Sequence, residues 1–211
     1  MPPRASCVGP DPFIVLLALW LFLPAYVANM APVLAMKVLP RWNAPIDGGR
    51  IWKDGKPLFG KGKTWRGLAA GVLLGALTCV VQAAIDDAGS PFVDFGLADG
   101  GWAVPVAFGA FLGLGAIVGD TVKSFFKRRT GREGGAPWVP FDQLDFVVGG
   151  LLSVGLAAWL IGPLLGYNWF VESFVAGDRW IALIVLLVLT PGLHFLVNLL
   201  GYKLKLKQVP L

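Results

Sequence analysis

Five long stretches of the chain are predominantly apolar. They cover about residues 12–36, 67–85, 101–119, 146–167 and 180–201, and none of them contains an Asp, Glu, Lys or Arg. A helix needs about 20 such residues to cross about 30 Å of hydrocarbon, which is close to the length of each stretch. The stretches lack the alternation of a barrel strand, and a helix satisfies its own backbone in lipid. The pattern therefore predicts an all-α integral membrane protein with five transmembrane helices, in a single domain that covers residues 1–211.

The composition supports this prediction and excludes other classes of protein. Hydrophobic residues make up 56% of the chain and charged residues 15%, with a mean hydropathy of +0.69. Soluble domains carry about 25% charged residues, so a water-soluble globular protein is excluded. Cys7 and Cys79 lie far apart and cannot form a disulfide framework or a Cys-rich metal site. The net charge of +5 reflects basic segments beside the membrane, and no nucleic-acid partner is expected.

The basic residues predict the orientation of the helices. Residues 37–66, residues 120–145 and the C-terminal tail together hold 16 of the 18 Lys and Arg residues. By contrast, residues 86–100 contain four Asp residues and no basic residue. The positive-inside rule then predicts a multi-pass protein of the cell membrane, with the N-terminus outside, the C-terminus in the cytoplasm and two long cytoplasmic segments. A signal peptide cleaved after residues 13–23 would reverse this arrangement, so we do not favour it.

The sharpest polar segment follows the third apolar stretch. One face of a helix there gathers a carboxylate, a hydroxyl and three cations at positions i, i+3, i+4, i+7 and i+8: Asp120, Lys123, Ser124, Lys127 and Arg128. We expect this helix to continue to Gly131. A carboxylate beside cations at a membrane boundary suits Mg²⁺ together with phosphate. The alternative is a basic collar that snorkels to anionic lipid headgroups, which we favour for Arg129 and Arg132.

Two further carboxylates precede the fourth apolar stretch. Asp142 and Asp145 are three residues apart, so they share a face if the helix has already begun there. Free carboxylates leading into an apolar helix are costly and should be compensated by cations. The helix dipole alone could stabilise one of them. Together with Asp120, across a turn rich in glycine at Gly131, Gly134 and Gly135, they form a plausible cage for one or two divalent ions.

A third polar segment leads into the second apolar stretch. Lys63, Thr64, Arg66 and the amide of Gly67 converge at a helix N-terminus, which favours anions such as phosphate. The segment is not a P-loop, because Pro57 stands where the first glycine belongs and no strand precedes it. Basic residues before a span also commonly serve topology alone.

Three polar residues stay open on sequence grounds. Asp47 lies in a turn-rich loop, as a ligand or simply as part of a turn. His194 and Asn198 are four residues apart in the fifth stretch, where hydrogen bonding between helices explains them as well as substrate contact does. We leave all three outside the predicted site.

These motifs resemble the CTP:phosphatidate cytidylyltransferase family, and within it the CDP-archaeol synthase branch. The resemblance covers nearly the whole chain and is carried by Gly119-Asp120, Ser124, Lys127-Arg128 and Asp142-Gln-Leu-Asp145. Lys63-Thr-Trp-Arg66-Gly67 is similar to a Lys-Thr-Trp-Glu-Gly segment of the wider family, with Arg in place of Glu. Other departures from the wider family are Gln143 for Arg, Glu133-Gly134 for a Lys-Asp pair and Trp138-Val-Pro140 for His-Gly-Gly. They fit the di-ether lipid branch.

The resemblance implies a membrane nucleotidyltransferase of phospholipid biosynthesis. Its members move CMP from CTP to an unsaturated archaeal di-ether glycerophosphate and release pyrophosphate. We expect an active site facing the cytoplasm, with Mg²⁺ held by Asp120, Asp142 and Asp145, and with these three and Lys127 as the catalytic residues. We expect the phosphates to be bound by Lys63, Thr64, Arg66, Gly67, Lys123, Ser124 and Arg128.

Two alternatives remain at this point. A CDP-alcohol phosphotransferase would also be a helical membrane enzyme, but its Asp-Gly-x-x-Ala-Arg pattern is missing, since the loop reads Asp47-Gly-Gly-Arg50. A non-enzymatic lipid-binding or transport protein would predict charges near mid-membrane or repeated halves, and neither is evident. The sequence leaves the oligomeric state open.

Overall fold

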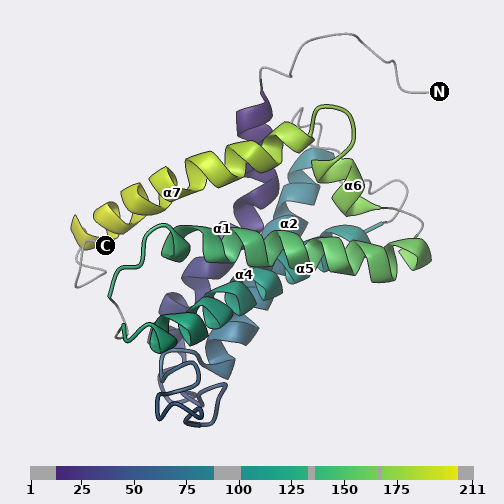
Figure 1. Ribbon diagram of the computed structural model, residues 1–211. Helices are drawn as coiled ribbons and strands as arrows, with labels where there is room; N and C mark the ends of the chain where they lie inside the picture. The colour runs from purple at the N-terminus through teal and green to yellow at the C-terminus, as the bar shows by residue number, and fades with distance from the viewer. Residues whose placement is uncertain (1–12, 88–100, 133–135, 166–167, 204–211) are drawn as a thin grey trace, which may run out of the picture.

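The computed structural model describes residues 13–87, 101–132, 136–165 and 168–203, and it is almost entirely α-helical (Figure 1). Its helices are α1 (Ile14–Val38), α2 (Trp65–Asp87), α4 (Ala103–Arg129), α5 (Phe141–Leu165), α6 (Trp169–Phe174) and α7 (Trp180–Lys203). Two isolated β-bridges, Pro45 to Thr64 and Ile51 to Pro57, occur between α1 and α2. The predicted fold class, an all-α membrane protein, is confirmed.

Four helices, α1, α2, α4 and α5, are long and apolar enough to cross a membrane. The apolar part of α7, Trp180–Leu196, is shorter, so the fifth span is shown only as a shorter apolar helix. The predicted extension of the third helix is confirmed, because α4 runs past residue 119 to Arg129. α5 begins at Phe141 rather than at residue 146, which places Asp142 and Asp145 on a helix. The short helix α6 was not predicted.

Aromatic side chains fill the centre of the bundle. Phe22 on α1 and Phe146 on α5 are fully buried, and their ring centroids lie 6.3 Å apart. The ring of Tyr26 packs against both, and its hydroxyl is 2.7 Å from the Thr190 hydroxyl on α7. Large apolar side chains such as Leu164, which is 83% exposed, point outward where hydrocarbon would surround them. These contacts join α1, α5 and α7 within the bundle.

Glycines allow α4 to approach two neighbours almost backbone to backbone. They are Gly109 and Gly113 toward α2, and Gly115 and Gly119 toward α5. A Cβ added to Gly113 would lie 2.4 Å from the Gly71 carbonyl oxygen, and one added to Gly119 would lie 2.2 Å from the Asp145 carbonyl oxygen. Small residues at such contacts are typical of packed membrane helices. The contact at Gly119 brings the polar end of α4 directly against the start of α5.

The segment between α1 and α2, residues 39–64, folds over the end of α4, and we call it the α1–α2 loop. It is the dark blue coil at the bottom of Figure 1. The Arg129 guanidinium donates to the Pro57 carbonyl oxygen at 2.9 Å and pairs with the Asp54 carboxylate at 3.3 Å. The same guanidinium lies 4.1 Å from the centre of the Phe125 ring. Arg129, which the sequence suggested as a topology residue, therefore attaches the loop to α4.

Candidate functional site

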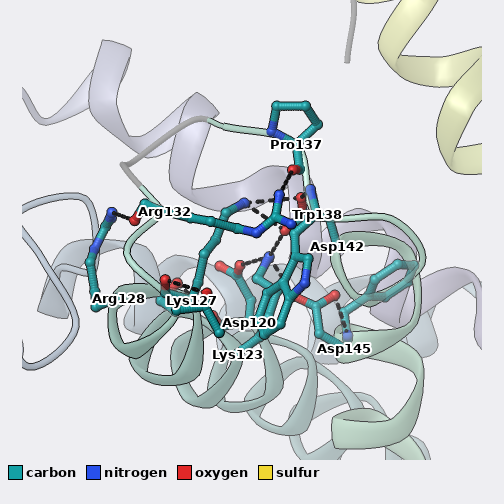
Figure 2. A network of polar contacts seen from close by, with 12 residues as sticks. Asp120, Lys123, Lys127, Arg128, Arg132, Pro137, Trp138, Asp142 and Asp145 are labelled. Atoms are coloured by element: carbon teal, nitrogen blue, oxygen red, sulfur yellow. Dashed lines mark hydrogen bonds and ion pairs between the residues drawn. The ribbon is translucent and has the colours of Figure 1, made fainter.

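Three carboxylates from α4 and α5 converge on one lysine (Figure 2). The Lys123 ammonium nitrogen lies 3.0 Å from Asp120 Oδ1, 2.8 Å from Asp142 Oδ1 and 2.8 Å from Asp145 Oδ2. We call Asp120, Asp142 and Asp145 the acidic trio. An ammonium has three N–H donors, so each can point at one carboxylate. The structure thus brings together the three carboxylates that the sequence predicted to act as a group.

Two more lysines complete the cluster. Lys63, from the α1–α2 loop, forms an ion pair with Asp120 Oδ2. The Lys127 ammonium lies 3.0 Å from both carboxylate oxygens of Asp142. The side chain of Lys127 is only 9% exposed and that of Asp145 only 5%. Three positive charges therefore balance the three negative charges of the acidic trio, which limits the cost of shielding them from water.

A glycine ends α4. Gly131 has a φ of +76° and follows the last turn of α4. Its N–H donates to the Arg128 carbonyl at 3.1 Å, while the Arg132 N–H donates to the Lys127 carbonyl at 3.2 Å. This is the hydrogen-bond pattern of a Schellman motif, which glycine favours because it adopts positive φ without strain. The chain is thereby released from the helix immediately after the basic face of α4.

The start of α5 is organised by its own carboxylates. Asp142 Oδ2 accepts a hydrogen bond from the Trp138 backbone N–H at 2.5 Å, and Asp145 Oδ1 accepts one from the Phe146 N–H at 2.7 Å. The Trp138 N–H precedes α5, so the Asp142 carboxylate ties the segment before the helix to its first turn, while the Phe146 N–H lies within the helix beside Asp145. Each of these two carboxylates therefore contacts both a lysine and the backbone.

Most of the predicted anion-binding segment at α2 is engaged within the protein. The Thr64 hydroxyl accepts a hydrogen bond from the Gly67 N–H at 3.2 Å, as an N-cap residue does. Arg66 is 4% exposed and donates to the Leu39 carbonyl at 2.6 Å. Of this segment, only Lys63 reaches the acidic trio. Phosphate binding by Thr64, Arg66 and Gly67 stays a prediction.

Ser124 and Arg128 lie on the same face of α4 but differ in their partners. The Ser124 hydroxyl donates to the backbone carbonyl of Asp120 at 2.8 Å, within its own helix. Arg128 donates to the Arg132 carbonyl at 3.1 Å and lies against Gly60, where a Cβ would be 3.2 Å from its Nη2. Among the described residues, no ion pair joins Arg128 to a carboxylate. Its charge is therefore available to an anionic ligand.

Asp47 shapes the α1–α2 loop. One carboxylate oxygen accepts a hydrogen bond from the Gly49 N–H at 2.9 Å, and the other accepts from the N–H groups of Phe59 at 2.9 Å and Gly60 at 3.1 Å. Burial opposes the charge, but these backbone hydrogen bonds outweigh it and hold the pKa of the Asp47 carboxyl below its usual range. The Asp47 carboxylate therefore stabilises the turn of the α1–α2 loop.

Of His194 and Asn198 on α7, the structure describes only the side chain of His194. The His194 ring lies 6.1 Å from the Phe146 ring, within the bundle. The side chain of Asn198 lies outside the described residues. Neither observation separates helix packing from substrate contact, so neither residue enters the site.

The donor set of the acidic trio fits a hard divalent cation. Carboxylate oxygens are what Mg²⁺ prefers, and one oxygen from each of the three residues already lies within 3.0 Å of a single nitrogen. In the part of the chain that the structure describes, no group of three or more His, Cys, Asp or Glu side chains is spaced to hold a metal as it stands. The three oxygens are arranged around an ammonium, whose contacts are longer than the about 2.0–2.1 Å of Mg²⁺ coordination.

Comparison with known proteins gives a consistent result. A family model described as CDP-archaeol synthase matches residues 13–211. A CDP-archaeol synthase from Methanosphaerula palustris is 43% identical over 192 residues, which cover 89% of this chain and 99% of the relative. One from Halorubrum lacusprofundi is 42% identical over 197 residues, 93% of this chain and 97% of the relative. A solved structure described as an intramembrane enzyme for archaeal membrane lipids biosynthesis is 32% identical with a TM-score of 0.56, covering 87% of this chain and 94% of that one.

Proposed function

The chain belongs to the CDP-archaeol synthase family of CTP-dependent cytidylyltransferases that act on an archaeal lipid, and we propose that the acidic trio and its lysines form its active site. The observation that carries this proposal is the convergence of Asp120, Asp142 and Asp145 on one cation position. The family assignment excludes a CDP-alcohol phosphotransferase and a non-enzymatic lipid-binding or transport protein.

The proposed reaction joins a lipid phosphate to a nucleotide. A phosphate oxygen of the unsaturated di-ether glycerophosphate attacks the α-phosphorus of CTP, the bond to the β-phosphate breaks, and pyrophosphate leaves as CDP-archaeol forms. Such transfers need positioning and neutralisation of several negative charges, with little covalent work by the protein. A cluster that holds three carboxylates and three lysines at the end of two membrane helices supports that chemistry.

Asp120, Asp142 and Asp145 would hold a divalent cation, for which Mg²⁺ is the proposed identity. When bound there, this cation neutralises charge on the phosphates and orients them for displacement. Asp120 and Asp142 keep 20% and 21% of their side-chain surface exposed, so a cation and its phosphate ligands have access from that side. The side chain of Asp145 is only 5% exposed, so it is the most buried carboxylate of the trio.

Cationic side chains around the acidic trio would hold the phosphates. Lys63, Lys127 and Arg128 approach from the α1–α2 loop and from α4, and Arg128 has a guanidinium suited to bidentate phosphate contact. Thr64 and Arg66 support this arrangement by fixing the start of α2 beside Lys63. The Gly67 N–H and the Ser124 hydroxyl form hydrogen bonds within their helices, and their direct contact with phosphate stays a prediction.

We also propose that the active site faces the cytoplasm, where CTP is available. This rests on the concentration of basic residues in residues 37–66 and 120–145. A single cysteine placed at Arg50 should resist an impermeant thiol reagent applied to intact cells, while one at Asp94 should be labelled. Labelling in the opposite pattern would reverse the orientation and remove the site from the nucleotide pool.

Pyrophosphate release tests the proposed chemistry. The purified protein should release pyrophosphate only when CTP, a di-ether glycerophosphate lipid and Mg²⁺ are all present. ATP in place of CTP tests nucleotide choice, and chelation tests the metal. Equal turnover after chelation would overturn the assignment of the acidic trio to Mg²⁺, and equal turnover with ATP would overturn cytidylyl transfer.

A further inference from the structure

Lys123 occupies the point at which the acidic trio would bind a metal (Figure 2). Its ammonium contacts one oxygen of each carboxylate, at 2.8 to 3.0 Å, and its side chain is 13% exposed. Three carboxylate oxygens therefore surround the ammonium within 3.0 Å, and its charge is directed at the acidic trio. In this arrangement Lys123 faces the acidic trio, and its predicted contact with phosphate stays a prediction.

A divalent cation and this ammonium cannot share the acidic trio. Mg²⁺ needs its oxygen ligands at about 2.0–2.1 Å, closer than the ammonium allows, and two cations among the same carboxylates repel each other. We propose that Lys123 is a built-in counter-ion that exchanges with the divalent cation, and that the displaced ammonium then contacts the phosphates of CTP. This inference rests on the proposed function of the same site.

The other two lysines are not equivalent to Lys123. Lys127 contacts Asp142 alone among the acidic trio, and Lys63 contacts Asp120 alone. Both can remain beside one carboxylate while other oxygens of the trio turn to a metal. Lys123 lies one helical turn after Asp120 on α4, and its four-carbon stem lets the ammonium move without movement of the helix.

The exchange couples metal binding to nucleotide binding. Without nucleotide, Lys123 balances part of the negative charge of the trio, and a metal must compete with it. When phosphates are present, the displaced ammonium gains new partners, so the competition is weaker. Each ligand therefore raises the affinity of the site for the other, as reciprocal linkage requires.

Binding of Mn²⁺ without CTP tests the exchange directly. Purified protein is titrated with Mn²⁺ and the free ion is followed by electron paramagnetic resonance. Lys123→Gln should bind Mn²⁺ at least about tenfold more tightly than the unaltered protein, because the competing charge is gone. Arg132→Gln removes one positive charge from the segment that follows α4 without altering a contact of the acidic trio, since Arg132 donates to the Pro137 carbonyl. It should change the affinity by less than about threefold. Equal or weaker binding by Lys123→Gln would overturn the proposal.

A second measurement uses the unaltered protein, so it does not depend on the folding of a variant. Lysines are methylated reductively with and without saturating Mg²⁺, and modification of each lysine is quantified by mass spectrometry. Mg²⁺ should increase modification of Lys123 several-fold more than that of Lys127. An unchanged or lower yield at Lys123 would contradict the exchange. If turnover still required Mg²⁺ in that case, the proposed function would stand and only the exchange would fail.

Discussion

Asp47 in the α1–α2 loop and the acidic trio at the ends of α4 and α5 are both shielded carboxylate sites, but their counter-groups differ. Asp47 is held by three backbone N–H groups, from Gly49, Phe59 and Gly60. The acidic trio is held mainly by the ammonium groups of three lysines. The first set of donors is fixed in the fold, whereas the second sits on flexible side chains.

This difference separates a structural carboxylate from a binding site. The backbone N–H groups cannot leave Asp47 unless the loop unfolds. The Asp47 carboxylate therefore keeps these hydrogen bonds as long as the loop is folded. Lysine ammonium groups can exchange with another cation at the cost of side-chain movement. The comparison therefore predicts that removal of charge from the acidic trio stops chemistry while the fold persists, and that removal of charge from Asp47 loosens the loop.

The largest effect is expected for Asp142→Asn. The substitution keeps the size of the side chain but removes the charge that contacts Lys123 and Lys127. Turnover with CTP and lipid phosphate should fall by at least about 100-fold, since a metal ligand and its electrostatic contribution are lost. Steady-state pyrophosphate release measures this, with size-exclusion chromatography to establish that the variant is folded.

Asp178→Asn is the matched control for this change. Asp178 is exposed and lies between α6 and α7, outside the cluster. Asp178→Asn removes the same charge, but outside the acidic trio. The activity of this variant should therefore stay near that of the unaltered protein. A similar loss of activity in both variants would mean that charge near the membrane matters in general, and the acidic trio would lose its special role.

Gly119→Ala should have the next largest effect. An added Cβ would lie 2.2 Å from the Asp145 carbonyl oxygen, which is backbone and cannot turn aside. α4 and α5 must separate, at a cost of about 1–3 kcal/mol in stability. Because the acidic trio spans these two helices, activity should fall roughly 10- to 100-fold. The loss of both properties is measured by thermal unfolding and by pyrophosphate release.

Gly192→Ala provides the comparison for Gly119. It lies on α7, where an added Cβ meets nothing within 4 Å, so stability and activity should be unchanged or slightly improved. If Gly119→Ala behaved in the same way, close contact of the two helices would not be what brings the acidic trio together.

The sequence predicted the helical part of the site better than the contacts made by the loop. The spacing of Asp120, Lys123 and Lys127 predicted one face of a long helix, and Gly131 predicted where that helix ends. These features are local, so they can be deduced from residues a few positions apart. The pairing of Lys63 with Asp120 joins residues far apart in the chain, and no local pattern specifies it.

The close packing of α4 was missed although a signal was present. Gly115 and Gly119 are four residues apart and face α5, as small residues at helix contacts commonly do. The role of Arg129 was also underestimated, because a basic residue after a span is explained by topology alone. Its contacts with Asp54 and Pro57 depend on how the α1–α2 loop folds back, which only the structure reveals.

Asp47→Asn should have a smaller effect on turnover than Asp142→Asn. Backbone donors flank both carboxylate oxygens, so the amide nitrogen of Asn must face an N–H group in either orientation. The loss of these bonds should cost about 1–3 kcal/mol of stability. Lys63 lies at the end of the same loop, so the KM for CTP should rise more than kcat falls. A loss confined to kcat would instead make Asp47 part of the chemistry.

The smallest effect is the acid sensitivity of the loop. Because the pKa of Asp47 is held below its usual range, its charge stabilises the fold above about pH 4 and loses this contribution as the pH falls through the lowered pKa. Between pH 5 and pH 8 the contribution should be constant. Thermal unfolding from about pH 6 to pH 3 should therefore show a smaller decline for Asp47→Asn than for the unaltered protein.

Metal binding in the presence of CTP compares the two carboxylate regions most directly. Mn²⁺ affinity is measured without the lipid substrate for the unaltered protein, Asp142→Asn and Asp47→Asn. The account predicts that Asp142→Asn binds at least about 100-fold more weakly, while Asp47→Asn stays within about threefold of the unaltered protein. Retention of tight Mn²⁺ binding by folded Asp142→Asn, or its loss in folded Asp47→Asn, would contradict the assignment of the acidic trio as the metal and nucleotide site.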